Sequence, residues 1–260
     1  MKKILLIATT PLTKDGLTKV ELDIINYNYN ILQFTLACGY AIKDEYTEYF
    51  KRLSINYITL PPKNKPLSYM ASIRKIVKSG KYDTIYIHGN SAMMFFEALP
   101  AKMGGAKRIV THCHNTKSDF PLIHYIVKPL FNKLVNIKIA CSSYAAKWAY
   151  NGHNVKIILN GIDTKQFLYN PEAGTVKRKE LHWENNFIIG HVGRFNKQKN
   201  HSQLIDIFEC IYQKNNDARL LLIGDGELKE EIREKVCQKG LSKFVAFGIL
   251  FRSEEHTSEL

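Results

Sequence analysis

Short apolar runs alternate with longer amphipathic stretches along most of the chain. This alternation predicts parallel strands joined by crossover helices, because strands that are buried on both faces read as continuous apolar runs. In the first part of the chain, the predicted strands are Ile4–Ala8, Gln33–Cys38, Asn56–Leu60, Thr84–His88, Arg108–His112, Lys138–Ser142 and Lys156–Leu159. The helices predicted between them are Thr18–Tyr27, Ser68–Ser79, Ala92–Met103 and Leu122–Leu134.

A polar stretch, residues 163–186, interrupts this rhythm and predicts a linker with a short helix. A second series follows, with strands Phe187–Gly193, Arg219–Gly224 and Phe244–Phe247 and helices Asn200–Gln213 and Glu227–Lys239. The pattern therefore predicts an α/β protein with two Rossmann-like, doubly wound domains, residues 1–162 and 187–251. The second domain ends after its third strand, whereas such a domain usually has about six. We expect it to be incomplete, with Phe187–Gly193 as an open edge.

The last nine residues, Arg252–Leu260, match nothing in this rhythm. They resemble the translation of a sequencing-library adapter read in frame after Phe251. We expect residues 252–260 to be a non-native tail and the reading frame to be cut short; a polar, frayed helix is the alternative.

The composition is that of a globular protein with an anionic partner. The chain has 260 residues, of which 45% are hydrophobic, and 37 Lys and Arg against 24 Asp and Glu give a net charge of +13. A nucleotide, a lipid phosphate or a nucleic acid would each suit this charge. A cluster of basic residues between Lys63 and Lys81 is either a solvated face or a membrane-facing patch.

The cysteines and the N-terminus indicate a cytoplasmic protein. Five cysteines show no paired metal-ligand spacing, which favours a reducing compartment. The apolar stretch Ile4–Ala8 is too short for a signal sequence or a membrane span. Peripheral contact with the inner face of the cell membrane stays open.

Two cations follow the first strand of the second series. Arg194 comes directly after Gly193, and Lys199 stands where the next helix is expected to begin. Ligands of open α/β sheets bind at the carboxyl ends of the strands, and unpaired amides at a helix start favour an anion. A solvated Arg and Lys is the structural alternative, but cations at a helix start oppose the helix dipole and need another reason to be there. The pair is therefore a candidate diphosphate clamp.

Three histidines end neighbouring strands of the first series. His112 and His114 close one strand and lie on the same side of it by alternation, and His88 ends the preceding strand. His112 and His114 are candidate catalytic residues, whereas packing is an equally good explanation for His88.

Two glycines are weaker candidates. Gly16, in the loop after the first strand, could let a phosphate approach, although a helix cap formed by Asp15, Gly16 and Thr18 competes with that role. Gly224 follows a strand and opens a helix, but the third glycine of a dinucleotide fingerprint would fall at Lys229. An NAD-dependent enzyme is therefore disfavoured.

Taken in order, these motifs resemble the family 4 retaining glycosyltransferases of GT-B architecture over residues 1–251. The strongest fragments are Val155–Asp163 with Phe167, and Gly193-Arg194 followed by Lys199-Asn200; supporting fragments are Tyr82–Gly89, Thr111–Thr116 and Leu222–Glu227. The resemblance implies two Rossmann-like domains across a cleft, the first on the acceptor side and the second binding a nucleotide-sugar.

The same resemblance implies roles for individual residues. Arg194 and Lys199 would bind the donor diphosphate and stabilise the charge that develops on it. Gly16, Gly193 and Gly224 would lie on the donor side, and His114 with His112 would contact the donor sugar. No metal ion and no cofactor are expected. The family also has two glutamates separated by seven residues further along, and Glu254, Glu255 and Glu259 do not fit that spacing.

The implied activity is hexosyl transfer with retained configuration, from a nucleotide donor, expected to be a UDP-sugar, to a glycan or a lipid-linked acceptor. Capsule or exopolysaccharide synthesis is the implied setting. Because the glutamate motif is missing, we expect this chain itself to be inactive and, with its open edge, poorly soluble. The alternatives are a non-catalytic nucleotide-binding fragment and another GT-B enzyme such as a nucleotide-sugar epimerase. A nucleic-acid binder is disfavoured by the dispersed lysines.

Overall fold

The structure, a computed structural model, describes residues 1–13 and 15–248. The chain divides into two compact units, Met1–Asp163 and Thr164–Leu260. The predicted tail, 252–260, and the last three residues of the predicted second domain, 249–251, lie outside the described residues.

The first unit is built on a seven-stranded parallel sheet with the order β3-β2-β1-β4-β5-β6-β7. Every strand predicted in this part of the chain is confirmed to within two residues. The strands are β1 (Lys2–Ala8), β2 (Leu32–Cys38), β3 (Asn56–Thr59), β4 (Thr84–Gly89), β5 (Ile109–Cys113), β6 (Ile137–Ala140) and β7 (Val155–Ile157). At the carboxyl ends of the central strands, Ala8 pairs with His88, which pairs with His112.

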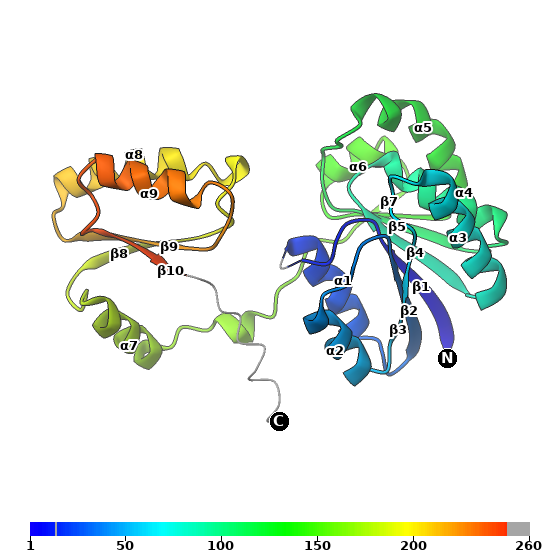
Figure 1. The fold of residues 1–260 in the computed structure, drawn as a ribbon, viewed down its shortest axis with the longest axis horizontal. Coiled ribbons are helices and arrows are strands. Elements are labelled where there is room, and N and C mark those ends of the chain that lie inside the picture. Colours follow the sequence, from blue (N-terminus) through cyan, green and yellow to red (C-terminus); the bar gives the residue numbers. More distant parts are fainter. Residues whose placement is uncertain (14, 249–260) are drawn as a thin grey trace. The chain divides into compact units, whose positions relative to one another are not determined.

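Helices cover both faces of this sheet, as Figure 1 shows. Alternate residues of β1 belong to different cores: Leu5 and Ile7 pack under α3 to α6, whereas Ile4 and Leu6 pack under α1 and α2. The sheet is thus buried on both sides, which explains its continuous apolar runs. The helical segments are α1 (Gly16–Asn26), α2 (Asp44–Arg52), α3 (Pro66–Gly80), η1 (Ala92–Met94), α4 (Phe95–Met103), α5 (Pro121–Leu134) and α6 (Ser143–Tyr150).

The second unit has a three-stranded parallel sheet with the order β10-β9-β8. Among the described residues β8 is an edge strand, as the sequence predicts for Phe187–Gly193. Helices α8 and α9 cover one face of the sheet (Figure 1). The segments are η2 (Thr164–Phe167), α7 (Pro171–Leu181), β8 (Phe187–Val192), η3 (Lys197–Lys199), α8 (His201–Lys214), β9 (Ala218–Ile223), α9 (Lys229–Gln238) and β10 (Val245–Gly248).

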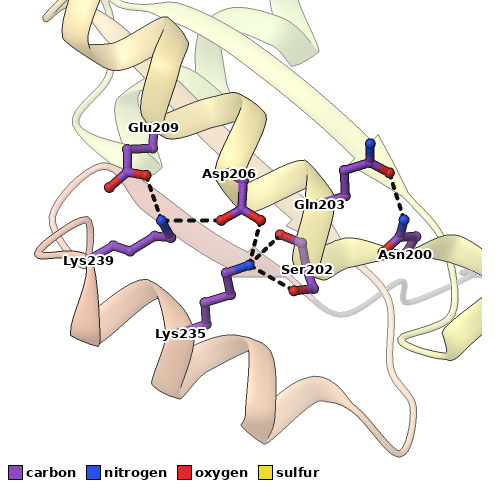
Figure 2. Close-up of polar contacts among 7 residues, drawn as sticks. All are labelled: Asn200, Ser202, Gln203, Asp206, Glu209, Lys235 and Lys239. Atoms are coloured by element: carbon purple, nitrogen blue, oxygen red, sulfur yellow. Dashed lines mark hydrogen bonds and ion pairs between the residues drawn. The ribbon is translucent and has the colours of Figure 1, made fainter.

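A polar network joins α8 to α9 (Figure 2). The Nζ atom of Lys235 donates to the carbonyl oxygen of Ser202 at 2.9 Å, to its hydroxyl at 2.8 Å and to Asp206 at 2.7 Å. Lys239 adds ion pairs to Asp206, at 3.2 Å, and to Glu209, at 2.5 Å. Because Ser202 lies in the first turn of α8, the network holds the helix start that follows the loop of Lys199.

None of the helices within the described part of the chain has both the length and the apolarity needed to cross a membrane.

Candidate functional site

The first unit has a topological switch point between β1 and β4, where ligands of open α/β sheets bind. The chain leaves β1 towards α1 on one face and leaves β4 towards α4 on the other. The amide of Thr9 donates to the carbonyl of His88 at 3.3 Å, so the two loops begin side by side. A Cβ atom on Gly89 would lie 2.7 Å from Cγ of Met94 and 2.8 Å from the hydroxyl oxygen of Thr9, so a larger residue would have to displace these side chains.

A histidine cluster (His88, His112 and His114) lies at this edge of the sheet. Nδ1 of His88 is 3.0 Å from Nε2 of His114, and the ring centres of His112 and His114 are 3.9 Å apart. The hydroxyl of Tyr86 is 3.2 Å from Nδ1 of His112. The structure therefore brings together both predicted catalytic histidines. It also places His88 beside them, for which the sequence had allowed either a functional or a packing role.

Burial keeps the cluster uncharged. Burial lowers the pKa of His112 to about 3, with a further contribution from the neighbouring His114. Burial also lowers the pKa of His114 to about 4, and the side chain of Asn160 acts in the opposite direction. The pKa of His88 is lowered well below its usual value by burial and then by the other two rings. At neutral pH these rings can exchange hydrogen bonds with a ligand but carry no charge.

The same three rings form a possible metal-ligand set. One ring nitrogen of each histidine lies within 4.8 Å of the others. Three neutral imidazoles can bind Zn²⁺ with Zn–N distances of about 2.0–2.1 Å. The rings would have to rotate to reach such distances, and the hydrogen bond between His88 and His114 would have to break.

The loop after β4 is held by aromatic packing. His124, from α5, accepts a hydrogen bond from the amide of Ala92 at 3.1 Å and stacks on Trp148 at 3.9 Å between ring centres. The indole of Trp148 donates to the carbonyl of Asn90 at 3.0 Å. This loop therefore has a fixed backbone beside the histidine cluster.

Gly16 is the first residue of α1, and its neighbour Asp15 is the helix cap. The carboxylate of Asp15 accepts from the amide of Thr18 at 2.9 Å and from the hydroxyl of Thr13 at 2.6 Å. The capping role that the sequence offered for this loop is confirmed for Asp15. A carboxylate at this helix start also competes with a phosphate, so contact between Gly16 and a donor phosphate stays a prediction.

In the second unit, the loops that follow β8 and β9 are joined backbone to backbone. The amide of Gly193 donates to Ile223 and that of Phe195 donates to Asp225, each at 2.9 Å. Gly224 has a φ of +150° and passes so close that a Cβ atom would lie 2.1 Å from the carbonyl oxygen of Gly193. Gly193 and Gly224 therefore build the loop that presents the predicted clamp.

Both clamp residues are exposed at this loop. The guanidinium of Arg194 is 3.3 Å from the carboxylate of Glu227, in an ion pair with both side chains more than half exposed. Lys199 lies in the turn η3, not in the helix itself, because α8 begins at His201. The side chain of Asn196 accepts from the amide of Lys199 at 3.1 Å and fixes the turn.

A buried histidine supports the same loop from beneath. His201 is 2% exposed, and its ring stacks on Phe195 at 4.1 Å between ring centres. The ring of His191, on β8, meets it edge-on at 4.8 Å. Burial lowers the pKa of His201, helped by His191 and Lys199, so it packs as a neutral ring.

Sequence reasoning missed three contacts of these sites. Asn160, which the sequence showed only as part of the fragment Val155–Asp163, acts on His114. Glu227 pairs with Arg194, and Tyr86 with His112. Strand register could have indicated one of them: Tyr86 lies two residues before His88, so it shares a face with the cluster.

Comparisons with known proteins agree with this architecture. The profile of Glycosyltransferase Family 4 matches residues 29–166, which is more than half of the chain. The profile of Glycosyl transferases group 1 matches residues 174–258. "Putative glycosyltransferase EpsF" of Bacillus subtilis (strain 168) is 27% identical over 256 residues, covering 94% of this chain but only 63% of that protein.

Solved structures share the fold. HepE of Anabaena, in complex with UDP, has a TM-score of 0.78 at 20% identity over 96% of this chain and 69% of its own. A UDP-GlcNAc 2-epimerase from Neisseria meningitidis, bound to UDP-GlcNAc, has a TM-score of 0.62 at 11% identity over 96% of this chain and 72% of its own. At such identities the likeness concerns the fold alone.

Proposed function

This chain belongs to glycosyltransferase family 4, and on that premise we propose that it derives from an enzyme that transfers a sugar from a nucleotide donor. The donor that we propose is a UDP-sugar. Since the chain spans 63% of the length of EpsF, the activity is proposed for the parent protein.

The observation that carries the proposal is the loop of Arg194 and Lys199. The close approach of Gly224 to Gly193 leaves no room for a side chain and fixes the backbone that presents both cations. We propose that they bind the donor diphosphate, Arg194 with its planar fork of donors and Lys199 as a point charge. Fixed cations where negative charge develops lower the barrier to breaking the bond between the anomeric carbon and the phosphate oxygen. No metal ion is required for this role.

His114 is the residue that we propose to contact the donor sugar, with His112 and His88 behind it. Because burial lowers its pKa to about 4, it would act as a neutral hydrogen-bonding partner of a hydroxyl and not as a cation. Transfer with retained configuration, a hexose as the transferred sugar, and a phosphate contact at Gly16 complete the proposed chemistry.

The proposed acceptor is a glycan or a lipid-linked glycan in exopolysaccharide or capsule synthesis. The family membership and the likeness to EpsF support this setting. Such an acceptor would place the enzyme in the cytoplasm, at the inner face of the cell membrane.

Calorimetry with UDP tests the clamp. We expect the 260-residue chain to bind UDP, and the double variant Arg194→Ala, Lys199→Ala to lose at least about tenfold in affinity, because each charge-assisted contact contributes about 1.5–3 kcal/mol. Lys197→Ala is the matched control, since it removes an exposed cation from the same turn. Equal UDP affinity in the double variant and the control would show that the clamp assignment is wrong.

A further inference from the structure

We propose that helix α5 (Pro121–Leu134) is a docking surface for an anionic lipid bilayer. The exposed face of α5 is apolar and is bordered by lysines, and its first turn lies close to the histidine cluster in the sequence. This inference rests on the proposed lipid-linked acceptor and deepens it, because it names the surface that would bring the enzyme to its substrate.

The exposed face of α5 carries a ridge of large apolar side chains. Leu122, Ile126 and Leu130 recur at every fourth residue and are 73%, 65% and 55% exposed. The opposite face is buried and consists of His124, Val127 and Phe131. The helix is therefore apolar on the side that points away from the core as well as on the side that faces it.

Aromatic side chains widen this ridge. Phe120, just before the helix, and Tyr125, on its flank, are 57% and 60% exposed. Ile123 lies on the other flank and is also exposed. Contiguous apolar patches of this kind mark interaction surfaces, and aromatic rings with a polar tip favour the boundary between water and lipid.

The charges around the ridge select an anionic partner. Lys117, in the loop before the helix, and Lys133, in its last turn, are exposed, and the amine of Lys128 is held at the carbonyl of Lys147 at 3.2 Å. From residue 115 to residue 136, Asp119 is the only carboxylate in the sequence. A second copy of the chain would oppose these lysines with lysines, whereas anionic headgroups would neutralise them.

The length of α5 sets how it would meet a bilayer. At about 1.5 Å per residue the helix is about 21 Å long, shorter than the hydrocarbon core of about 30 Å. It would lie in the plane of the interface, with the ridge inserted and the lysines at the headgroups. The basic helix α3 is different, because its exposed cations Arg74, Lys75 and Lys78 have few exposed apolar neighbours.

This placement would bring a lipid-linked substrate to the histidine cluster. Only the loop from Asn115 to Phe120 separates His114 from the start of α5. His124, on the buried face of the helix, holds the loop after β4 through the amide of Ala92. The docking surface and the switch point of the sheet thus share one rigid support.

Vesicle co-sedimentation of the 260-residue chain tests the proposal. We expect binding to vesicles of phosphatidylglycerol and phosphatidylethanolamine, and little binding to phosphatidylcholine alone. The variant Leu122→Ser, Ile126→Ser, Leu130→Ser should lower the partition coefficient at least about tenfold, since it removes three exposed side chains from the insertion. Lys117→Glu with Lys133→Glu should weaken binding to the anionic vesicles.

The matched control is Tyr27→Ser with Ile31→Ser, which removes exposed apolar side chains beside α1, the helix on the opposite face of the sheet. This control should bind vesicles like the unmodified chain, and all variants should melt at similar temperatures. The proposal is overturned if the unmodified chain does not bind anionic vesicles, or if the serine variant binds them as well as the control does. If the unmodified chain forms a dimer and the serine variant does not, the ridge is instead an interface with a second copy of the chain.

Calorimetry with UDP on the same samples separates this proposal from the proposed function. The serine variant should bind UDP like the unmodified chain, because its changes lie outside the second unit. A chain that binds UDP but not vesicles would contradict only the docking surface. A chain that binds vesicles but not UDP would contradict only the proposed nucleotide site.

Discussion

His88 and His114 share one hydrogen bond across two neighbouring strands, with Nδ1 of His88 at 3.0 Å from Nε2 of His114. His88 is fully buried, and His114 is partly exposed. Only one of the two nitrogens can carry the proton, so the tautomer of His88 fixes the tautomer of His114. The tautomers of the buried and the partly exposed ring are thus coupled, and the tautomer of His88 contributes to whether His114 offers a ligand a donor or an acceptor.

Replacing His88 should release this constraint. In the His88→Phe variant the ring volume is nearly kept but the hydrogen-bond partner is lost, so His114 should populate both tautomers. The nitrogen chemical shifts of the histidine side chains report the tautomer directly. His124, which stacks on Trp148 outside the cluster, is the internal control and should keep its shifts. Unchanged shifts at His114 would contradict a role for His88 in setting its tautomer.

The histidine cluster should also make the first unit sensitive to acid. The pKa values of His112, about 3, and His114, about 4, lie below that of an unfolded histidine, about 6.5. Below pH 6.5 the histidines of the unfolded chain bind protons, whereas those of the folded unit do not. The free energy of unfolding should therefore fall by about 1.4 kcal/mol for each pH unit that the pH decreases, for each such proton.

Urea unfolding between pH 7 and pH 4.5 measures this slope. Trp148 becomes the only tryptophan of the chain in a Trp183→Phe background and reports on the first unit. Adding His112→Gln should reduce the slope by one proton. A slope that is the same with and without His112 would show that this ring is not held neutral by the fold.

The strands and the shared face of His112 and His114 could be predicted because both follow from local alternation. Buried parallel strands leave continuous apolar runs, and each predicted strand is confirmed to within two residues. The helices α2 and α6 were missed. In α2 only Tyr46 and Phe50 are buried among nine mostly polar residues, and α6 packs largely through alanines, so neither has a broad apolar stripe.

The contacts between distant segments could not be predicted. The pairing of Arg194 with Glu227 and the influence of Asn160 on His114 depend on how loops cross, which no periodicity records. Lys199 was predicted at the start of the next helix. In the structure it ends the turn η3, and the left-handed Asn200, with a φ of 47°, separates it from α8. An apolar pattern predicts that a helix is present, but it does not fix the residue at which the helix begins.

Gly224 should tolerate no side chain. Its φ of +150° is rarely adopted by other residues, and a Cβ atom would lie 2.1 Å from a backbone oxygen that cannot rotate away. We expect Gly224→Ala to lower the free energy of unfolding of the second unit by about 2–4 kcal/mol. Gly190→Ala is the control, because within residues 1–13 and 15–248, apart from its own two chain neighbours, no atom lies within 4 Å of the added Cβ position.

Hydrogen exchange would locate the damage in this variant. The amides of Gly193 and Phe195, which donate to Ile223 and Asp225, should lose protection before the rest of β8 does. Equal stability of Gly224→Ala and Gly190→Ala would show that the two loops can separate without cost.

The ion pair between Arg194 and Glu227 should compete with a diphosphate. A hydrogen bond from the backbone amide of Glu227 lowers the pKa of its carboxyl group, and Arg194 lowers this pKa further. Glu227→Gln should free the guanidinium and raise UDP affinity by about two- to fivefold at low salt, with a smaller gain at high salt. Calorimetry at two salt concentrations measures this, and Glu231→Gln is a control of equal charge. A loss of affinity would instead indicate that Glu227 itself contacts the nucleotide.

Glu21 should destabilise the first unit as the pH rises. The side chain is 1% exposed, and within the described part of the chain neither carboxylate oxygen has a hydrogen-bond partner. Burial raises its pKa well above the usual value, and the nearby Asp15 adds to the effect. The folded unit therefore keeps a proton that the unfolded chain releases above about pH 4.5, so stability is complete below that pH and is lost as the pH rises towards the folded pKa.

Glu21→Gln separates this effect from the acid sensitivity of the histidines, because the two have opposite signs. The variant should be more stable than the unmodified chain at neutral pH, and the difference should shrink by up to about 1.4 kcal/mol per pH unit as the pH falls, vanishing near pH 4.5. Asp23→Gln is the control, since Asp23 lies on the same helix, pairs with Lys19 at 2.6 Å and is partly exposed. A stability difference for Glu21→Gln that does not change with pH would mean that the carboxyl group binds the same number of protons in the folded and the unfolded chain, so that folding does not raise its pKa.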